Sequence, residues 1–381
     1  MGAMEERAGV PPARPCHRGS PGRGAPACLV VRRRSRWWRD VPPVRAKPET
    51  PMPHPIPVPG DSRPEVTGKV PDDLLRVGDL DPETLTELLD LAAAMKQDPL
   101  GWERDLRGGA IGCLFEKPST RTRVSLATAA QRLGMSAIVL NRDEMQLGHG
   151  ETVADTASVL SSFLDAVTVR TFDHATVEQM ADAATIPVVN ALSNTHHPCQ
   201  SLADLLALRE RFGALAGLTA TFLGDGTSNT CNSFLAAAAA SGMHLTIASP
   251  PEYATDAHVL AEAREVMAQT GGSVTLTTEP IDAVRTAQAV YAEVWVPMDK
   301  PHEREERAAR LAAYRVDDAL LARAPREAVA LHCLPAVRGE EITSEVLDGP
   351  RSLVWNQAAN RLPTAQAVLH TLITTNRRRT V

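Results

Sequence analysis

The sequence lacks several features that would assign it to common classes of protein. Its six cysteines are scattered, and no Cys-x-x-Cys pair occurs. This argues against a disulfide framework and predicts free thiols in a reducing compartment, the cytoplasm. No apolar run approaches the length of a membrane span, so we expect no membrane partner. Internal repeats and the Gly-x-Gly-x-x-Gly dinucleotide motif are also missing.

Charge is unevenly distributed along the 381 residues. Residues 1–50 contain 11 Lys and Arg and 4 Asp and Glu, a net charge of +7, whereas the whole chain carries −6. The remaining residues therefore carry −13, and this acidic body argues against a nucleic-acid partner. Residues 1–66 are rich in Pro, Gly and Arg and show no sustained periodicity, so we expect a disordered extension. A transit peptide, or sequence upstream of a later start such as Met52, is an alternative interpretation.

From Ala110 onward, short apolar runs alternate with helical patterns. The predicted strands are Ile111–Phe115, Ala137–Leu140, Ala166–Arg170, Val188–Ala191, Thr219–Leu223, His244–Ala248, Ser273–Leu276, Ala289–Val296, Ala328–Leu331 and Ser352–Trp355. Repeated β–α units of this kind predict an α/β protein with two parallel-sheet domains joined by helices. We place the first domain at 67–210, the second at 211–360, and a C-terminal helix that returns to the first domain at 361–381. A first helix should begin after Asp81, with a buried stripe of Leu85, Leu88, Leu89 and Ala92.

One stretch, residues 115–123 with the sequence Phe-Glu-Lys-Pro-Ser-Thr-Arg-Thr-Arg, suggests an anion site. It follows a predicted strand and precedes Val124, Leu126, Ala129 and Leu133, which are spaced like the inner face of a helix. Backbone N–H groups and the positive end of the helix dipole would point at the hydroxyls and guanidinium groups there. Such a helix start can bind a phosphate or a carboxylate. On its own, the stretch is equally compatible with a plain helix cap.

Further polar residues follow other predicted strands, at the sheet edge where parallel α/β proteins bind ligands. They are Gln146, Arg170, Asn190, the segment 196–200 (His-His-Pro-Cys-Gln), the segment 224–229 (Gly-Asp-Gly-Thr-Ser-Asn), the segment 295–299 (Trp-Val-Pro-Met-Asp), the segment 332–335 (His-Cys-Leu-Pro) and Asn360–Arg361 before the final helix. His197 and His332 could be buried structural histidines. Together with Cys199 and Cys333 they lack the usual zinc spacing, so we predict no metal site. Their shared position after strands favours one common site.

These motifs resemble the ornithine branch of the aspartate/ornithine carbamoyltransferase family. The resemblance covers about residues 70–378 and rests on the Ser-Thr-Arg-Thr loop, Gln146, His-Pro-Cys-Gln, His-Cys-Leu-Pro and Asn360–Arg361 in the family's order. It implies one domain for carbamoyl phosphate, a Rossmann-like domain for an amine or amino-acid acceptor, and homotrimers with sites at the subunit boundaries. It also implies transfer of a carbamoyl group without a cofactor. The expected product is of the citrulline type, as in arginine biosynthesis.

The resemblance assigns a role to each matching residue. The phosphate of carbamoyl phosphate would be held by Ser119, Thr120, Arg121, Thr122, Arg361 and Gln146, the last from the neighbouring subunit. The carbamoyl group would contact Arg170, His197 and Gln200. Arg121, Arg170, His197 and Cys333 would be catalytic, and the acceptor would contact Asn229, Glu293, Pro297, Met298, Cys333 and Leu334.

The acceptor half departs from the pattern of the family. Ser228 replaces the first of two adjacent asparagines, and Glu293 aligns with an Asp. The segment Pro-Met-Asp at 297–299 stands where a Ser-Met-Gly loop is usual. We therefore expect a changed acceptor preference, with ornithine, 2,3-diaminopropionate and putrescine as alternatives. A pseudoenzyme that binds only carbamoyl phosphate is a further alternative.

Overall fold

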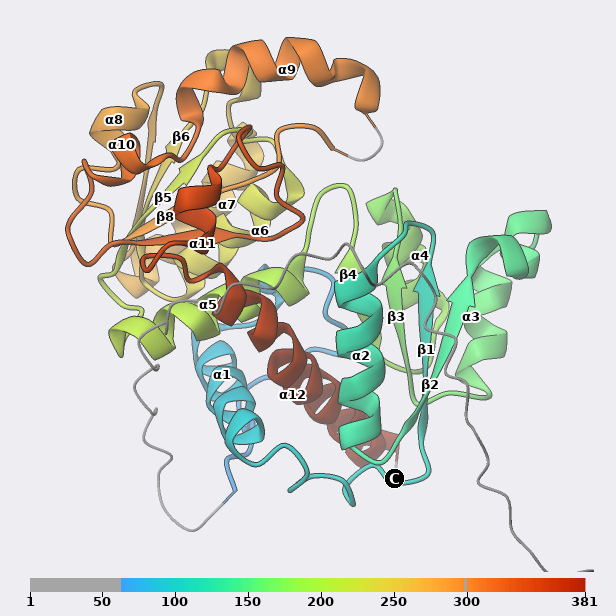
Figure 1. The fold of residues 1–381 in the computed structure, drawn as a ribbon. Coiled ribbons are helices and arrows are strands. Elements are labelled where there is room, and N and C mark those ends of the chain that lie inside the picture. Colours follow the sequence, from blue (N-terminus) through green and yellow to red (C-terminus); the bar gives the residue numbers. More distant parts are fainter. Residues whose placement is uncertain (1–62, 298–299, 381) are drawn as a thin grey trace, which may run out of the picture. The chain divides into compact units, whose positions relative to one another are not determined.

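The structure, a computed structural model, describes residues 63–297 and 300–380 (Figure 1). Most of the expected extension, 1–66, lies outside the described residues; within its last part, Val66 packs against the core. The strands are β1 (Ala110–Phe115), β2 (Ser136–Asn141), β3 (Ala166–Arg170), β4 (Val188–Leu192), β5 (Thr219–Leu223), β6 (His244–Ala248), β7 (Ser273–Thr277), β8 (Ala289–Ala292) and β9 (Val329–His332).

The helices cover these strands. They are α1 (Pro82–Gln97), α2 (Thr120–Arg132), α3 (Val153–Ser161), α4 (His174–Ala183), α5 (Pro198–Phe212), α6 (Asn229–Ala240), α7 (Ala257–Thr270), α8 (Pro280–Ala283), α9 (Arg304–Leu311), α10 (Asp318–Leu321), α11 (Ser344–Asp348) and α12 (Val354–Thr380), with 3₁₀ turns η2 (Val77–Asp79), η3 (Arg142–Glu144), η4 (Gln146–His149), η5 (Pro251–Tyr253), η6 (Pro301–Glu303) and η7 (Ala312–Tyr314).

The strands form two sheets in which every pairing is parallel. The first has the order β2-β1-β3-β4 and the second has the order β7-β6-β5-β8-β9. The predicted α/β class with two parallel sheets is confirmed. The carboxyl ends of β1, β3 and β4 meet at one edge of the first sheet, and those of β5, β8 and β9 meet at one edge of the second.

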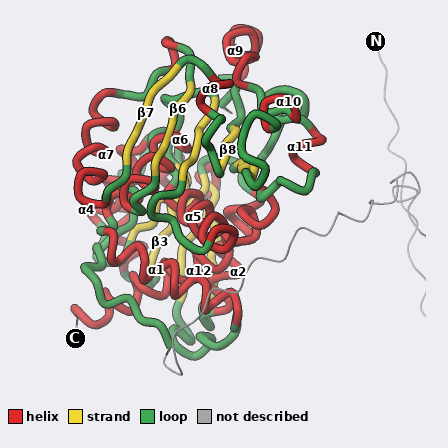
Figure 2. The backbone as a smooth tube through the Cα atoms, turned by 90° about the vertical axis from the view of Figure 1, so that its left-hand side faces the viewer, coloured by secondary structure: helices red, strands yellow, loops and turns green. Residues whose placement is uncertain are grey.

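Alternating side chains of β1 face two different cores. Ile111, Cys113 and Phe115 belong to the large core that includes residues of α1, α2 and α12, whereas Leu114 belongs to a smaller core with residues of α3 and α4. On the second sheet, helices α6 and α7 contact each other, and α7 lies beside strand β7 (Figure 2). The buried central strands explain why their apolar runs were recognisable.

Helix α1 begins as predicted. The Asp81 side chain accepts a hydrogen bond from the Thr84 amide at 2.7 Å between Oδ1 and N, and the predicted stripe of Leu85, Leu88, Leu89 and Ala92 is buried. In α2 the prediction was partly wrong. Leu126, Ala129 and Leu133 are buried, but Val124 is 58% exposed, because the buried face of α2 runs through Thr122, Ser125, Leu126, Ala129 and Ala130 and Val124 lies off that face.

The C-terminal region differs from the expectation. Ser352 makes only an isolated bridge to Ala330, and α12 begins at Val354, so the predicted strand Ser352–Trp355 was wrong. Asn360 and Arg361 lie inside this helix, not before it, and Pro363 is also internal. A short apolar run does not distinguish a strand from a buried helix start. Helix α12 packs against α1, α2 and α5 (Figure 1), which brings Arg361 to the start of α2.

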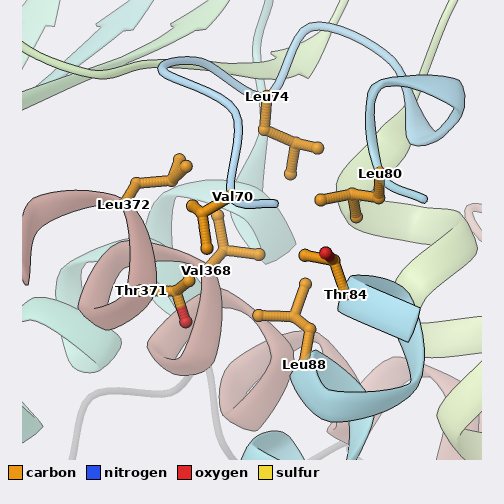
Figure 3. A pocket seen from close by; sticks show the side chains of 8 residues that line it. All are labelled: Val70, Leu74, Leu80, Thr84, Leu88, Val368, Thr371 and Leu372. Carbon is orange, nitrogen blue, oxygen red and sulfur yellow. The ribbon is translucent and has the colours of Figure 1, made fainter. Parts of the chain in front are cut away.

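A small apolar cavity lies between the chain preceding α1, α1 itself and α12 (Figure 3). Its lining residues are Val70, Leu74, Leu80, Thr84, Leu88, Val368, Thr371 and Leu372. Two threonines supply its only polar groups, so this cavity offers nothing to a charged substrate. Among the described residues, no helix is long and apolar enough to cross a membrane.

Candidate active site

The loop after β1 begins α2 with a hydroxyl cap. Ser119 has an extended backbone, and its Oγ accepts a hydrogen bond from the Thr122 amide at 3.2 Å. Thr120 is exposed and Arg121 is partly buried. The amide groups of this first turn and the helix dipole are oriented toward the space before the cap. The predicted helix start is therefore present, with the local structure of an anion site.

Three guanidinium groups gather near this helix start. Arg361 is buried in α12, where its Nη2 donates to Thr122 Oγ1 at 3.0 Å and its Nη1 donates to Gln200 Oε1 at 2.8 Å. Arg170, at the carboxyl end of β3, is also buried, and its Nε has no hydrogen-bond partner among the described residues. Within that part of the chain, Arg121, Arg170 and Arg361 form no ion pair with a carboxylate.

The electrostatics of the cluster favour an anionic ligand. Burial, followed by the positive charges of Arg361 and Arg121, lowers the pKa of Arg170 to about 10. Burial also lowers the pKa of Arg121 and that of Arg361. Guanidinium groups remain protonated at neutral pH, so the cluster presents positive charge that no ion pair from the described part of the chain neutralises. A dianionic phosphate placed there would relieve the mutual repulsion.

His197 adds a neutral donor to the cluster. It caps α5, its backbone N–H donates to Ser233 Oγ at 2.7 Å, and its Nδ1 has no partner among the described residues. Burial, followed by the charges of the nearby arginines, holds the pKa of His197 well below its usual range. The imidazole is therefore neutral at pH 7, and one ring nitrogen can donate a hydrogen bond to a ligand oxygen.

The two predicted glutamine ligands differ in environment. Gln200 is buried, and both ends of its amide have protein partners, Arg361 at Oε1 and Asp204 at Nε2. Gln146 lies on η4 with an exposed side chain, and no hydrogen bond within the described part connects that side chain to the arginines. The structure thus brings together Ser119, Thr122, Arg121, Arg170, His197, Gln200 and Arg361 within one chain, and it leaves Gln146 apart.

A second polar cluster lies at the carboxyl edge of the second sheet. Ser228 caps α6, since its Oγ accepts from the Cys231 amide at 3.1 Å, and it donates to the buried carboxyl group of Glu293. Burial raises the pKa of Glu293 to about 8, whereas hydrogen bonds from Ser228 and Thr230 oppose the shift and the charge of Asp225 adds to it. A cation bound beside Glu293 would favour its ionised form.

Three other residues predicted to contact the acceptor, Asn229, Pro297 and Met298, say less about how an acceptor would bind. Asn229 donates from Nδ2 to the Ser193 carbonyl at 2.6 Å, which connects α6 to the loop after β4. Pro297 is partly buried, and Met298 lies outside the described residues. Asn229 therefore links the two sheets in this structure through its Nδ2. Its Oδ1 accepts only a weak hydrogen bond, from the Thr230 hydroxyl at 3.3 Å.

Cys333 and Leu334 follow β9 between the two clusters. Burial raises the pKa of the Cys333 thiol, the negative charge of Glu293 adds to this, and the positive charge of Arg121 opposes it. The thiol is therefore neutral, and it is close enough to respond to charges in both clusters. Both ring nitrogens of His332 already have protein partners. Its Nδ1 accepts a hydrogen bond from the Leu334 amide at 2.8 Å, and its Nε2 lies 3.1 Å from Glu341 Oε1. His332 thus orients the loop.

No group of three or more His, Cys, Asp or Glu side chains in residues 63–297 and 300–380 is arranged to hold a metal ion.

Sequence reasoning missed the residues that support this site. Asp204, Tyr291 and Gln357 form a buried hydrogen-bonded group behind Gln200. A signal for Asp204 was present, since it follows Gln200 by four residues and so lies on the same face of α5. Tyr291 and Gln357 had no comparable signal, because their proximity depends on how distant elements pack.

Comparison with known proteins identifies relatives of both parts of the chain. Residues 72–210 match the family model described as aspartate/ornithine carbamoyltransferase, carbamoyl-P binding domain. Residues 216–372 match the model described as aspartate/ornithine carbamoyltransferase, Asp/Orn binding domain. The two matches follow each other along most of the described chain.

Individual relatives agree with the two family matches. An ornithine carbamoyltransferase of Methanoculleus marisnigri is 49% identical over 268 residues, which cover 70% of this chain and 85% of the relative. One from Acidothermus cellulolyticus is 47% identical over 296 residues, which cover 77% of this chain and 94% of the relative. Among solved structures, ornithine carbamoyltransferase from Pyrococcus furiosus superposes with a TM-score of 0.75 at 41% identity, covering 78% of this chain and 95% of that one.

Proposed function

The chain belongs to the aspartate/ornithine carbamoyltransferase family, and we propose that it transfers the carbamoyl group of carbamoyl phosphate to the side-chain amine of L-ornithine. The products are citrulline and phosphate. The observation that carries the proposal is the cluster of Arg121, Arg170 and Arg361 at the start of α2, which no ion pair within residues 63–297 and 300–380 neutralises. Relatives named ornithine carbamoyltransferase at 47–49% identity support the same activity.

The first sheet supplies the site for carbamoyl phosphate in this proposal. The phosphate lies before the cap of α2, where Ser119, Thr120 and Thr122 supply hydroxyl or amide donors. Arg121 supplies a planar pair of donors from α2, and Arg361 lies beside Thr122. Family models for carbamoyl phosphate at 72–210 and for the acceptor at 216–372 support a division close to the predicted domains 67–210 and 211–360. Gln146 is assigned to the phosphate of a neighbouring subunit.

The reaction is a substitution at the carbamoyl carbon. The neutral amine attacks this carbon, a C–N bond forms, and the carbonyl oxygen becomes an oxyanion in a tetrahedral intermediate. Arg170 and the neutral His197 donate hydrogen bonds to this oxyanion, an effect worth about 3–4 kcal/mol for each well-placed donor. The C–O bond to phosphate then breaks, and the departing phosphate takes the amine proton.

In this proposal the amine substitutes directly on carbamoyl phosphate, an already activated donor, so the reaction needs no organic cofactor. The donors proposed for the oxyanion, Arg170 and His197, are side chains of the protein itself.

In this proposal the second polar cluster, around Ser228 and Glu293, binds the amino-acid acceptor. Glu293, whose pKa is raised to about 8, can ionise when a cationic ammonium group lies beside it. Cys333 and Leu334 follow β9 and are assigned to the reacting side-chain amine. Because Ser228 and Glu293 differ from the residues usual in the ornithine branch, a shorter diamine such as 2,3-diaminopropionate is the second candidate acceptor.

We propose a homotrimer on separate grounds. The edge strand β2 carries Ile138, which is 47% exposed, and the nearby α3 region carries Val159 at 48% and Phe163 at 73%. Exposed large apolar side chains on an edge strand and on a helix of the same domain favour a protein contact there. Gln146 follows β2, so such a contact would place it at a neighbouring site.

We place the protein in the cytoplasm and the reaction in arginine biosynthesis, consistent with free Cys113, Cys199, Cys231 and Cys333.

One steady-state experiment tests the proposed function. Purified protein is assayed for phosphate release from carbamoyl phosphate with ornithine, 2,3-diaminopropionate, 2,4-diaminobutyrate, lysine and putrescine. The proposal predicts the highest kcat/KM with ornithine. A higher value with a shorter diamine would transfer the activity to the second candidate, and no turnover with any amine would favour the pseudoenzyme.

A further inference from the structure

A fully buried carboxylate, Asp204 of α5, collects three hydrogen bonds behind the arginine cluster. Gln200 Nε2 donates to Asp204 Oδ1 at 2.7 Å, and Gln357 Nε2 donates to the same oxygen at 2.6 Å. Tyr291 donates from its hydroxyl to Oδ2 at 3.0 Å. None of these partners is a cation, so the carboxylate is held by neutral donors from α5, α12 and β8.

The orientation of Gln200 depends on this carboxylate. An ionised carboxylate can only accept hydrogen bonds, so it attracts the NH₂ end of the Gln200 amide. The amide oxygen must then point the other way, and it accepts from Arg361 Nη1 at 2.8 Å. With the opposite amide orientation, an NH₂ group would face a guanidinium, and neither could accept from the other.

The same network continues toward the acceptor cluster. Gln357 Oε1 accepts from the His332 amide at 2.9 Å, and His332 is the last residue of β9, immediately before Cys333. Gln357 Nε2 also lies 3.2 Å from the Tyr291 hydroxyl. One buried carboxylate thus connects α5, α12, β8 and β9, and it lies between Arg361 on one side and the loop after β9 on the other.

We propose that Asp204 is a positioning residue for carbamoyl phosphate: its carboxylate fixes the amide of Gln200, and the amide oxygen fixes the guanidinium of Arg361 beside Thr122. The inference rests on the proposed function, since it assigns carbamoyl phosphate to the arginine cluster. Burying a carboxylate without a cationic partner is costly, and burial raises the pKa of Asp204 to about 6. The three hydrogen bonds that the carboxylate accepts offset this cost, and they order the binding site.

A role limited to packing predicts a different result from a positioning role. Removing the charge would then lower stability and leave the affinity of the folded protein for carbamoyl phosphate unchanged. Tyr291→Phe is the matched control, because it removes one donor from Oδ2 in the same buried group and leaves both amide bonds on Oδ1.

The test is calorimetric titration of carbamoyl phosphate into wild type, Asp204→Asn, Tyr291→Phe, Gln200→Ala and the double variant Asp204→Asn/Gln200→Ala. Asp204→Asn should raise the Kd about ten-fold, because a neutral amide replaces a charge-assisted acceptor. Tyr291→Phe should change it less than about two-fold. In the Gln200→Ala background, Asp204→Asn should have little further effect, since the carboxylate acts through Gln200.

Each outcome distinguishes this inference from the function on which it rests. Each titration is made at a temperature where a denaturation curve shows the variant fully folded, because a reversibly unfolded fraction would raise the apparent Kd by itself. A Kd for Asp204→Asn equal to that of wild type overturns the positioning role, and so does an undiminished effect in the Gln200→Ala background. If wild type itself fails to bind carbamoyl phosphate, the proposed function fails instead.

Discussion

The hydroxyl group of Ser228 donates a hydrogen bond to the buried carboxyl group of Glu293. The two residues are 65 positions apart, one at the cap of α6 and the other just after β8. The family resemblance of the sequence aligns both with positions where the ornithine branch is expected to carry other residues. A shorter side chain at 228 is thus matched by a carboxyl group at 293 that reaches one methylene further, and the two departures form one contact.

This contact predicts non-additive effects on the acceptor. Glu293→Asp retracts the carboxyl group from Ser228, and Ser228→Asn places a larger side chain against the full-length Glu293. We expect each single change to lower kcat/KM for the preferred amine about ten-fold, equivalent to about 1.4 kcal/mol. The double variant should recover most of the loss, because the longer Asn restores the contact with the shorter Asp.

Two measurements control this experiment. The KM for carbamoyl phosphate should stay unchanged in all three variants, since the donor cluster lies at the first sheet. Losses that simply add in the double variant would show that the two positions act independently.

The raised pKa of Glu293 predicts a pH dependence of stability. Its pKa is about 8 in the folded protein against an ordinary value of 4.5, so between these values the folded state holds a proton that the unfolded state has lost. The contribution of this group to the free energy of unfolding therefore falls as the pH rises from about 5 to about 8. Glu293→Gln should remove this contribution and become more stable relative to wild type as the pH rises.

Urea denaturation at several pH values checks this prediction. The exposed Glu265 of α7 offers a control, and Glu265→Gln should keep the slope of wild type. An identical pH dependence in Glu293→Gln and wild type would mean that Glu293 is ionised in the folded state at neutral pH.

The apolar side chains near β2 predict the assembly. Phe163→Lys places a charge on a side chain that is 73% exposed, so it should hardly change the stability of a single chain. If this surface joins subunits, the variant should dissociate in sedimentation and lose activity, because Gln146 of a neighbouring chain is then missing. Leu276→Lys, on the edge strand β7 and 41% exposed, should remain a trimer. A wild-type protein that sediments as an active monomer would contradict the trimer.

Much of the fold could be predicted because its strands are short, apolar and separated by turn residues. The strand from Ala166 to Arg170 and that from Thr219 to Leu223 have the predicted bounds. The start of α12 could not be predicted, because Val354 and Trp355 follow a strand-like pattern and Pro363 resembles a helix start. Proline inside the helix is compatible with the fold since neighbouring helices hold α12 in place.

The candidate site could be predicted where function depends on local sequence. Ser119 caps α2 because β1 ends at Phe115, Pro118 interrupts the chain before the helix and hydroxyls follow, all of which is visible within a few residues. The contact between Arg361 and Thr122 spans 239 positions, and the group around Asp204 joins α5, β8 and α12. Such contacts follow from packing, which a single sequence does not reveal. The assigned roles of Gln146 and Met298 stay predictions.

The central claim is that carbamoyl phosphate binds at the arginine cluster, and Arg121→Ala tests it most directly. Arg123 provides a matched control on the same helix, since its guanidinium lies over the Phe115 ring and donates to Asn141 Oδ1 at 2.7 Å. Loss of a charge-assisted contact worth about 1.5–3 kcal/mol should raise the Kd for carbamoyl phosphate by a factor of about 10–100 in Arg121→Ala. Arg123→Ala should stay within about three-fold of wild type. A calorimetric Kd for Arg121→Ala equal to that of wild type would contradict the account.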